Sequence, residues 1–302
     1  MSVTPLGAPN ISQSGAAQPI EGTSLWKSAR RRLVRNRAAM GGLIMLAIIA
    51  LLAILAPYIS AHAMDDISWD QIGAPPNWEQ GYYFGTDSNG RDLFARTLYG
   101  ARVSLMVGIL ASIVSLVIGV TYGAVAGYLG GAVDNVMMRI VDILYSLPFM
   151  FFVILLTVFF GRNIFLIFVA IGAVEWLDMA RIVRGQTLAL KHREFIEAAH
   201  AFGVSNSAIV RRHIIPNILG PVMVFVTLTV PKVILLESFL SFLGLGVQEP
   251  MTSWGVLISD GARDMETAPW SLLFPATFLA VTLFSLNFLG DGLRDALDPK
   301  DR

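Results

Sequence analysis

The sequence contains no cysteine and little charge. Of its 302 residues, Asp, Glu, Lys and Arg make up 15%, against about 25% in a typical soluble domain. The absence of cysteine excludes disulfide bonds, thiolate nucleophiles and cysteine-ligated metals. The 22 basic and 22 acidic residues balance, which argues against nucleic-acid binding through bulk positive charge. With 55% hydrophobic residues and a mean hydropathy of +0.63, the composition predicts a polytopic membrane protein.

Motifs for common membrane-associated chemistry are also missing. The sequence has neither a G-x-x-x-x-G-K-[ST] phosphate loop nor an H-E-x-x-H zinc motif. Its four histidines lie outside or at the edges of the long apolar runs, which disfavours an intramembrane Ser–His protease; they are His62, His192, His200 and His213. The sequence therefore predicts a non-catalytic chain that binds no metal and no cofactor.

Long apolar runs give the predicted fold class. A membrane-spanning helix needs about 20 predominantly apolar residues, and six runs meet this requirement. The fourth and fifth are the weakest, because both contain charged residues and charge at membrane depth is costly. The sequence predicts an all-α membrane protein with six transmembrane helices, over residues 38–61, 103–133, 143–161, 164–180, 214–244 and 267–290.

Basic residues alternate from one side of these runs to the other. Residues 1–40 carry six basic side chains and one acidic side chain, and residues 181–213 carry six basic and two acidic side chains. Residues 62–101 carry two basic and six acidic side chains, and residues 245–268 carry one and four. Because an excess of Lys and Arg marks the cytoplasmic side, both termini and residues 181–213 are predicted to be cytoplasmic.

The same pattern divides the chain into a six-helix domain and two tails. Residues 1–40 are predicted to be a cytoplasmic tail with a basic pre-membrane segment, residues 41–290 the transmembrane domain, and residues 291–302 a second cytoplasmic tail. Residues 25–39 are predicted to form an interfacial helix with arginines at the lipid headgroups, unless the basic cluster serves only to set topology. The glycines of residues 290–292 are predicted to end the last helix.

Between the fourth and fifth runs, the sequence predicts a short helix that ends in a glycine turn. The spacing of residues 193–202 is compatible with a helix, and it places Phe195, Ala199 and Phe202 on one predicted apolar face. Gly203 follows where a helix-ending glycine is expected.

A second short helix is predicted after this turn. Ser205 is predicted to cap a helix over residues 206–212, and Pro216 suits the first turn of the fifth span. The result is a rigid helix–glycine–helix element on the cytoplasmic face. Such an element is suited to docking into a groove on another protein.

The residues of this element carry a resemblance. The sequence contains the pattern E-A-A, then three residues, then a glycine, and then a proline 13 residues after that glycine. The residues of this pattern are Glu197, Ala198, Ala199, Gly203 and Pro216. It resembles the loop of permease subunits of binding-protein-dependent ABC importers. The alternative, a packing loop without a partner, leaves the spacing unexplained.

Further stretches resemble the oligopeptide, dipeptide and nickel branch of that family. His213 departs from the general pattern, which has isoleucine there, but residues 213–217 look like the peptide-transporter branch. Residues 84–92, 238–246 and 290–299 resemble the same branch, and the first of these also predicts a tight Asp-Ser-Asn-Gly turn. The chain is most similar to the C-type permease subunit of oligopeptide importers.

This resemblance implies a type I ABC importer permease (MetI-like) architecture, with its core from about residue 103. It implies a multi-pass protein of the bacterial inner membrane, whose first span wraps a second homologous permease. Two cytoplasmic ATPases would bind ATP and Mg, and a periplasmic or extracellular protein would bind the peptide. Nothing implies a nucleic-acid partner. The coupling loop, about residues 181–215, would transmit closure of the ATPases through the E-A-A helix, with Arg211 and Arg212 flanking it.

The resemblance leaves the cargo open. It implies oligopeptide import, and a dipeptide, nickel or another small solute is the alternative because these importers share the same motifs. A secondary transporter is a second alternative from another class. It is disfavoured because the sequence shows no internal repeat and because a docking helix would then have no partner.

The charged residues within the runs form a further candidate site. Asp178 and Arg181 are predicted to pair at the cytoplasmic boundary, since they are three residues apart on a helix, and Glu175 needs a cation from elsewhere. Lys232 and Glu237 are candidate contacts for a passing peptide along the translocation path. Packing against the partner permease or a position among the outer headgroups is the alternative for these two residues.

Overall fold

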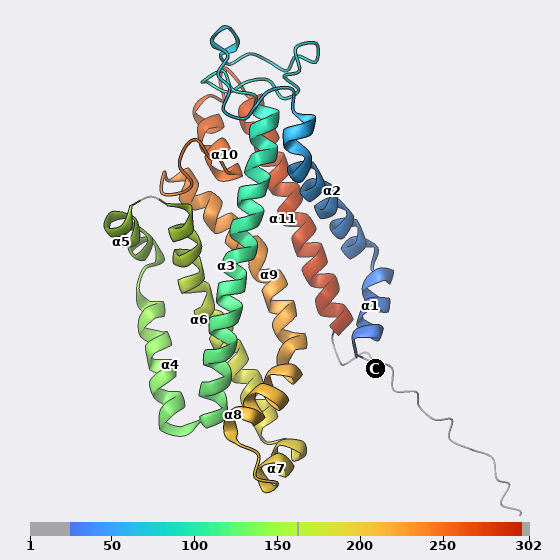
Figure 1. Cartoon of the computed structure of the whole chain (residues 1–302), viewed down its shortest axis with the longest axis vertical. Helices are drawn as coiled ribbons and strands as arrows, with labels where there is room; N and C mark the ends of the chain where they lie inside the picture. Colours follow the sequence, from blue (N-terminus) through green and yellow to red (C-terminus); the bar gives the residue numbers. More distant parts are fainter. Residues whose placement is uncertain (1–24, 162, 298–302) are drawn as a thin grey trace, which may run out of the picture.

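The computed structural model describes residues 25–161 and 163–297, and this part of the chain is helical, with turns and two isolated β-bridges between the helices (Figure 1). The helices are α1 (Leu25–Arg35), α2 (Arg37–Ile59), η1 (Trp69–Gln71), α3 (Leu93–Leu129), α4 (Gly131–Ser146), α5 (Phe149–Phe160), α6 (Ile164–Lys191), α7 (Glu194–Ala201), α8 (Asn206–Ile209), the π-helical turn η2 (Val210–Ile214), α9 (Ile215–Phe242), α10 (Trp254–Arg263) and α11 (Trp270–Leu297).

Within the described residues, four helical segments are long and apolar enough to cross a membrane. They are α2, α3, α9 with the turns before it, and α11, and the pair α4–α5 makes a fifth if it is one broken span. Helix α6 falls outside this group because its apolar half also holds three charged residues, Glu175, Asp178 and Arg181. The all-helical class is confirmed, and the count of six spans stays a prediction.

The prediction of one continuous span over residues 143–161 is wrong. Helix α4 ends at Ser146, and α5 begins at Phe149 at an angle of 81° to it. Pro148 explains the break, because proline has no N–H to donate and disfavours a helical residue before it.

The ends of the first and last spans also differ from prediction. Asn36 interrupts the predicted 25–39 helix, since its side chain caps α2 by accepting from Ala39 N at 3.2 Å. Helix α11 does not end at the glycines of residues 290–292 but runs to Leu297. A Cβ atom at Gly292 would lie 2.3 Å from the Ala39 side chain, so this glycine allows close helix packing. Of the predicted tail over residues 1–40, the first 24 residues lie outside the described residues.

Helices α3 and α6 pack in backbone contact. Along one face of α3, three glycines recur every fourth residue, at Gly119, Gly123 and Gly127, and face α6. A Cβ atom at Gly123 would lie 2.4 Å from the carbonyl oxygen of Ala180. Because α3 carries no side chain at these positions, its backbone approaches α6 closely, and the two helices form the closely packed centre of the molecule.

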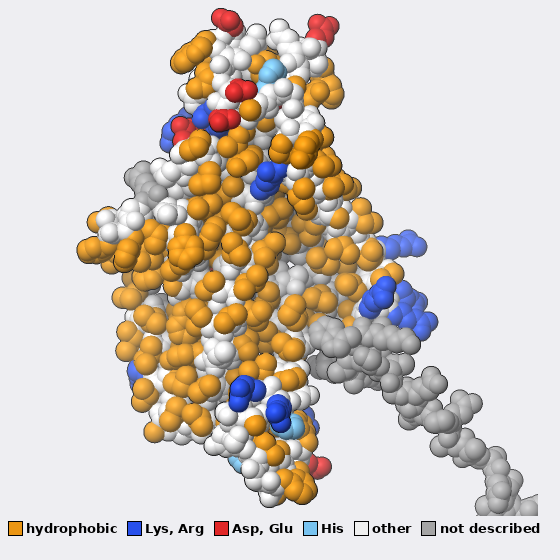
Figure 2. Space-filling model, in the orientation of Figure 1, with side chains coloured by type: hydrophobic (Ala, Val, Ile, Leu, Met, Phe, Trp, Pro, Cys, Tyr) orange, Lys and Arg blue, Asp and Glu red, His pale blue; other side chains and the backbone are white. Residues whose placement is uncertain are grey.

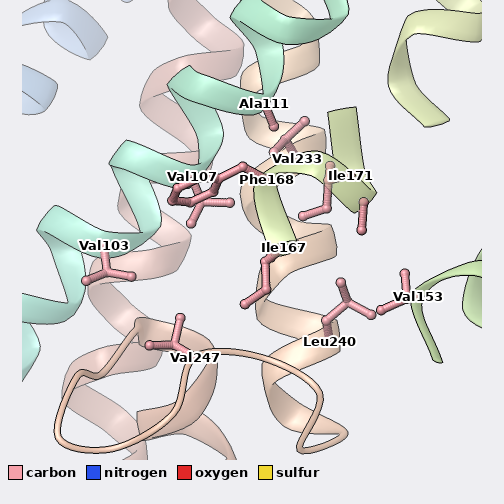
Figure 3. Close-up of a cluster of buried hydrophobic side chains, with 11 residues drawn as sticks. Val103, Val107, Ala111, Val153, Ile167, Phe168, Ile171, Val233, Leu240 and Val247 are labelled. Carbon is pink, nitrogen blue, oxygen red and sulfur yellow. The ribbon is translucent and has the colours of Figure 1, made fainter. Parts of the chain in front are cut away.

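Buried hydrophobic clusters extend from this pair in both directions. One joins α3, α5, α6 and α9 with Val247 of the loop that follows α9 (Figure 3). A second joins α3, α6 and α9 to α7 and α8. Hydrophobic side chains cover most of the middle of the face shown in Figure 2, and charged ones gather at its two ends and on the flank beside α1. Residues 60–92, here named the cap, lie at the end opposite α7 and α8 (Figure 1).

Candidate functional site: the E-A-A helix and the charged groups

Gly203 ends the short helix α7 as the sequence predicts. Its backbone has a φ of +74°, a left-handed conformation that glycine adopts at little cost. Gly203 N donates to the carbonyl of His200 at 2.9 Å, and Val204 N donates to that of Ala199 at 3.1 Å. These bonds satisfy carbonyls at the helix end and turn the chain sharply toward α8.

The second half of the element is helical but is not a simple α-helix. Ser205 stands at the N-cap of α8, as predicted, but its side chain forms no capping bond. Its carbonyl instead accepts from Ala208 N and Ile209 N, both at 2.9 Å. The turn η2 then leads without a break into α9, and Pro216 lies in the first turn of that helix, as predicted.

The apolar residues of α7 do not share one face. Ile196 and Ala199 are 1% and 8% exposed and join the cluster that contains α3 and α9. Phe195 is 43% exposed, and Phe202, at the C-cap, is 87% exposed. The predicted face of Phe195, Ala199 and Phe202 is wrong, because Ile196 and Ala199 form the buried face of α7. Phe202 lies where the backbone leaves the helix.

The exposed side of α7 carries the first two residues of the E-A-A pattern. Glu197 and Ala198 are exposed, as are Arg211 and Arg212 on the neighbouring turn. A groove of about 400 Å³ lies between α3 and the α8–η2 segment. It is lined by Thr121, Val125, Tyr128, Leu129, Asn206, Ser207, Val210, Arg211 and Ile215. The element therefore presents a small apolar surface bordered by charge.

A polar contact that sequence reasoning missed fixes this element to α3. The Tyr128 hydroxyl lies 2.7 Å from His200 Nε2 and donates to Asn206 Oδ1 at 3.1 Å. The Tyr128 and His200 rings are parallel, with centroids 5.9 Å apart. Tyr128 lies 72 residues before His200, and nothing in the sequence connects the two.

The charged residues of the fourth and fifth apolar runs pair differently from the prediction. Lys232 Nζ lies 3.0 Å from Glu175 Oε2 and 3.2 Å from Asp178 Oδ2. Glu175 thus obtains its cation from another helix, as expected. The predicted Asp178–Arg181 pair is wrong, because Asp178 faces Lys232 while Arg181 bonds to Asp142 of α4 at 2.9 Å.

The two candidate path residues occupy different environments. The side chain of Lys232 is 55% exposed and borders a cavity of about 360 Å³ between α6 and α9. Glu237 is fully buried. It accepts hydrogen bonds from Ser241 at 2.7 Å and from Ser104 of α3 at 3.3 Å. Glu237 therefore joins α9 to α3 inside this chain.

A charged cluster ties the cap to the loop after α9. Arg91 bonds to Asp87 and to Glu249, each at 2.8 Å, and the predicted turn over residues 87–90 closes with Gly90 N donating to Asp87 O at 2.9 Å. The Arg91 guanidinium lowers the pKa of Glu249. Burial raises the pKa of Asp92, the N-cap of α3, to about 6. The sequence points to residues 84–92 but not to their contact with Glu249.

Comparisons with known proteins give the family. Residues 119–302 match the model of the binding-protein-dependent transport system inner membrane component, and residues 24–76 match that of the N-terminal transmembrane domain of oligopeptide transport permease C. The chain belongs to this permease family.

In the part of the chain that the structure describes, no group of three or more His, Asp or Glu side chains could hold a metal ion.

Three relatives illustrate the similarity. The chain is 65% identical over 283 residues to the oligopeptide transport system permease protein OppC of Escherichia coli K12, covering 94% of each chain. It is 58% identical to the OppC of Haemophilus influenzae, covering 94% of this chain and 91% of the relative. It is 47% identical to the dipeptide transport system permease protein DppC of Bacillus subtilis, covering 92% of this chain and 87% of the relative.

These matches confirm the resemblance found in the sequence. The chain is an OppC-type permease of an ABC importer, a non-catalytic component of the inner membrane, with a MetI-like domain. ABC importers work as complexes, so the chain functions with other subunits.

Proposed function

We propose that this permease moves oligopeptides across the bacterial inner membrane and that separate ATPase subunits drive it. The observation that carries the proposal is the 65% identity, over 94% of the chain, to a permease named for oligopeptide transport. The geometry of α7 agrees with it, since Glu197 and Ala198 are exposed while Ile196 and Ala199 hold the helix against the membrane domain.

Helix α7 is the proposed docking point for an ATPase. Its exposed side, with Arg211 and Arg212 beside it, would enter a cleft on the ATPase, and Gly203 and Pro216 would set the angle between α7 and α9. ATP and Mg would be bound by two such ATPases and not by this chain. A second homologous permease would complete the pore, and an external peptide-binding protein would deliver the cargo.

The proposed topology has six spans and two cytoplasmic termini. Helix α6 would be a span despite its charges, because 28 residues reach about 42 Å and its two acidic groups are paired with Lys232. The bent pair α4–α5 would be the third span. The basic α1 and the basic α7–η2 segment would then lie on the same, cytoplasmic side, and the acidic cap would lie outside.

Lys232 is the proposed contact with the translocation path. It lies in α9 about 26 Å from the start of that helix, with more than half of its side chain exposed. A charged group at this depth faces a water-filled path or another subunit, because exposure to lipid is costly. Glu237, enclosed within the chain, would support the path by fixing α9 to α3. Unchanged peptide uptake by Lys232→Gln would contradict this assignment.

The coupling role is tested by a charge reversal. Glu197→Lys should leave the chain inserted and should lower peptide transport at least tenfold, because the docking face would carry the opposite charge. Glu266→Lys makes the same change at an exposed site at the opposite end of the molecule and should transport normally. Transport by Glu197→Lys at the parental rate would refute the assignment.

Co-purification and stimulation test the class and the cargo. The parental chain, extracted gently from its membrane, should carry a second permease and ATPases whose activity rises with oligopeptide-loaded binding protein. Stimulation by a dipeptide-loaded protein alone would favour the dipeptide alternative, for which the DppC relative gives a reason. A chain that carries no ATPase would refute the proposal.

A further inference from the structure

We infer that α3 is the element that connects the two ends of this permease, and that the Tyr128–His200–Asn206 hydrogen bonds are the link through which α7 moves it. The inference rests on the proposed function, because it requires α7 to receive the motion of an ATPase. It adds a route for that motion, from the docking helix to the cap, through a helix that is distant from α7 in the sequence.

The direction of the hydrogen bonds makes this link specific. A tyrosine hydroxyl has one proton and two acceptor positions. Tyr128 donates to Asn206 Oδ1 at 3.1 Å and therefore accepts from His200 Nε2 at 2.7 Å. One hydroxyl at the end of α3 thus holds both the helix α7 and the helix α8. Lys191, at the end of α6, donates to the Tyr128 carbonyl at 3.3 Å and joins the same point.

The other connections of α7 are turns of the main chain. It is joined to α6 through His192 and Arg193, which are outside the helices, and to α8 through the left-handed Gly203. No atom lies within 4 Å of a Cβ position at Gly203, and its neighbour Val204 packs against the same cluster as Ile196 and Ala199. The hydrogen bonds of Tyr128 and the buried contacts of Ile196 and Ala199 are what can transmit displacement of α7.

Helix α3 is long enough to carry this displacement to the cap. It is continuous over 37 residues, about 55 Å. At its far end, Leu93 N donates to Gly85 O of the cap at 3.1 Å, and Arg96 lies 3.4 Å from Asp87. The indole of Trp254 in α10 donates to Thr97 O at 3.1 Å. Both ends of α3 are therefore fixed to other elements.

Helix α6 would move together with α3. Gly119, Gly123 and Gly127 bring the backbone of α3 close to α6, and Arg184 of α6 forms two 2.6 Å bonds to Asp134, beyond the end of α3. Because α6 carries Glu175 and Asp178, a shift of α3 also displaces the groups that hold Lys232.

The test removes the hydroxyl and keeps the ring. In the assembled transporter, Tyr128→Phe should retain its ATPases and their basal activity. Stimulation of ATP hydrolysis by loaded binding protein, and peptide transport, should both fall about tenfold, which corresponds to the loss of a typical hydrogen bond or two. Tyr122→Phe is the matched control. This tyrosine is also in α3, and its hydroxyl donates to Met137 O of α4 at 2.9 Å, away from α7.

Two histidine variants complete the test. His200→Gln keeps a side-chain donor and should retain at least half of the stimulation, whereas His200→Ala should behave like Tyr128→Phe. Parental stimulation and transport in Tyr128→Phe would overturn the inference. Loss of ATPase binding in Tyr128→Phe would also overturn it, since the hydroxyl would then shape the docking surface only. If the parental chain itself binds no ATPase, it is the proposed function that fails.

Discussion

At the scale of single residues, the polar groups inside this membrane protein are held by partners from distant segments. Glu175 and Asp178 share Lys232, and Glu237 accepts from Ser104 of α3 as well as from Ser241 of its own helix. Each partnership reduces the large cost of burying charge away from water. Asp92 is the contrasting case, because one of its carboxylate oxygens accepts from Phe94 N at 2.9 Å while the other has no hydrogen-bond partner.

The raised pKa of Asp92 predicts a specific pH dependence. The pKa is about 6 in the folded chain, against 3.8 for the free group. Between these values the folded state binds more protons, so the contribution of Asp92 to the free energy of unfolding falls as pH rises, by about 2–3 kcal/mol in total. Asn at this position keeps a cap acceptor and does not titrate. The thermal unfolding midpoint of Asp92→Asn, relative to the parent, should therefore rise from pH 4 to pH 7.

Asp66→Asn serves as the control for this measurement, because Asp66 is an exposed residue of the cap whose side chain also accepts from a main-chain N–H, that of Ala63. Its midpoint relative to the parent should change much less over the same range. A midpoint difference for Asp92→Asn that is constant with pH would contradict the assigned shift.

At the scale of elements, small residues decide how closely the helices pack. The glycines of α3 bring its backbone against α6, and Gly292 brings α11 against the start of α2. In both places a glycine within a helix, which costs some helix stability, allows a contact that a side chain would prevent.

Gly123→Ala and Gly185→Ala should change stability in opposite directions. A Cβ atom at Gly123 would lie 2.4 Å from a backbone oxygen of α6, and we expect a loss of about 1–3 kcal/mol because the helices must separate. At Gly185, on α6, no atom lies within 4 Å, and alanine should add about 0.5–1 kcal/mol. Thermal unfolding midpoints of the detergent-purified chains measure both. A midpoint for Gly123→Ala at or above that of the parent would contradict the packing argument.

At the scale of the whole molecule, the cap and the α7–η2 segment lie at opposite ends, with the apolar surface between them (Figures 1 and 2). This arrangement matches a chain that crosses a bilayer and presents different surfaces on its two sides. In the proposed topology, the cap and the turn after α5 are external, and α7 is cytoplasmic.

The absence of cysteine permits a direct test of this topology. Single substitutions Asp70→Cys in the cap and Phe160→Cys at the end of α5 should react with a membrane-impermeant thiol reagent in intact spheroplasts. Ala201→Cys, at the exposed end of α7, should react only after permeabilisation, and the cysteine-free parent gives the background. Labelling of Ala201→Cys from outside would reverse the orientation, and protection of Phe160→Cys in intact spheroplasts would contradict the external position of the turn after α5.

The sequence by itself determined the class, the membrane location and the position of the E-A-A element. These properties depend on local features: the length of apolar runs, the left-handed turn that Gly203 permits, and the proline that begins α9. The break at Pro148 was also local, and the apolar run across it led to the wrong prediction of a straight span.

Only the tertiary structure decided which groups meet. Asp178 has a suitably spaced arginine three residues away, but Lys232 from another helix stands closer to its carboxylate and also satisfies Glu175. Tyr128 and His200 are joined only because α3 and α7 converge at the same end of the molecule. Helical periodicity gives the direction of a side chain from its own axis, whereas its partner depends on how separate helices pack, and that packing is decided by contacts between residues far apart in the chain.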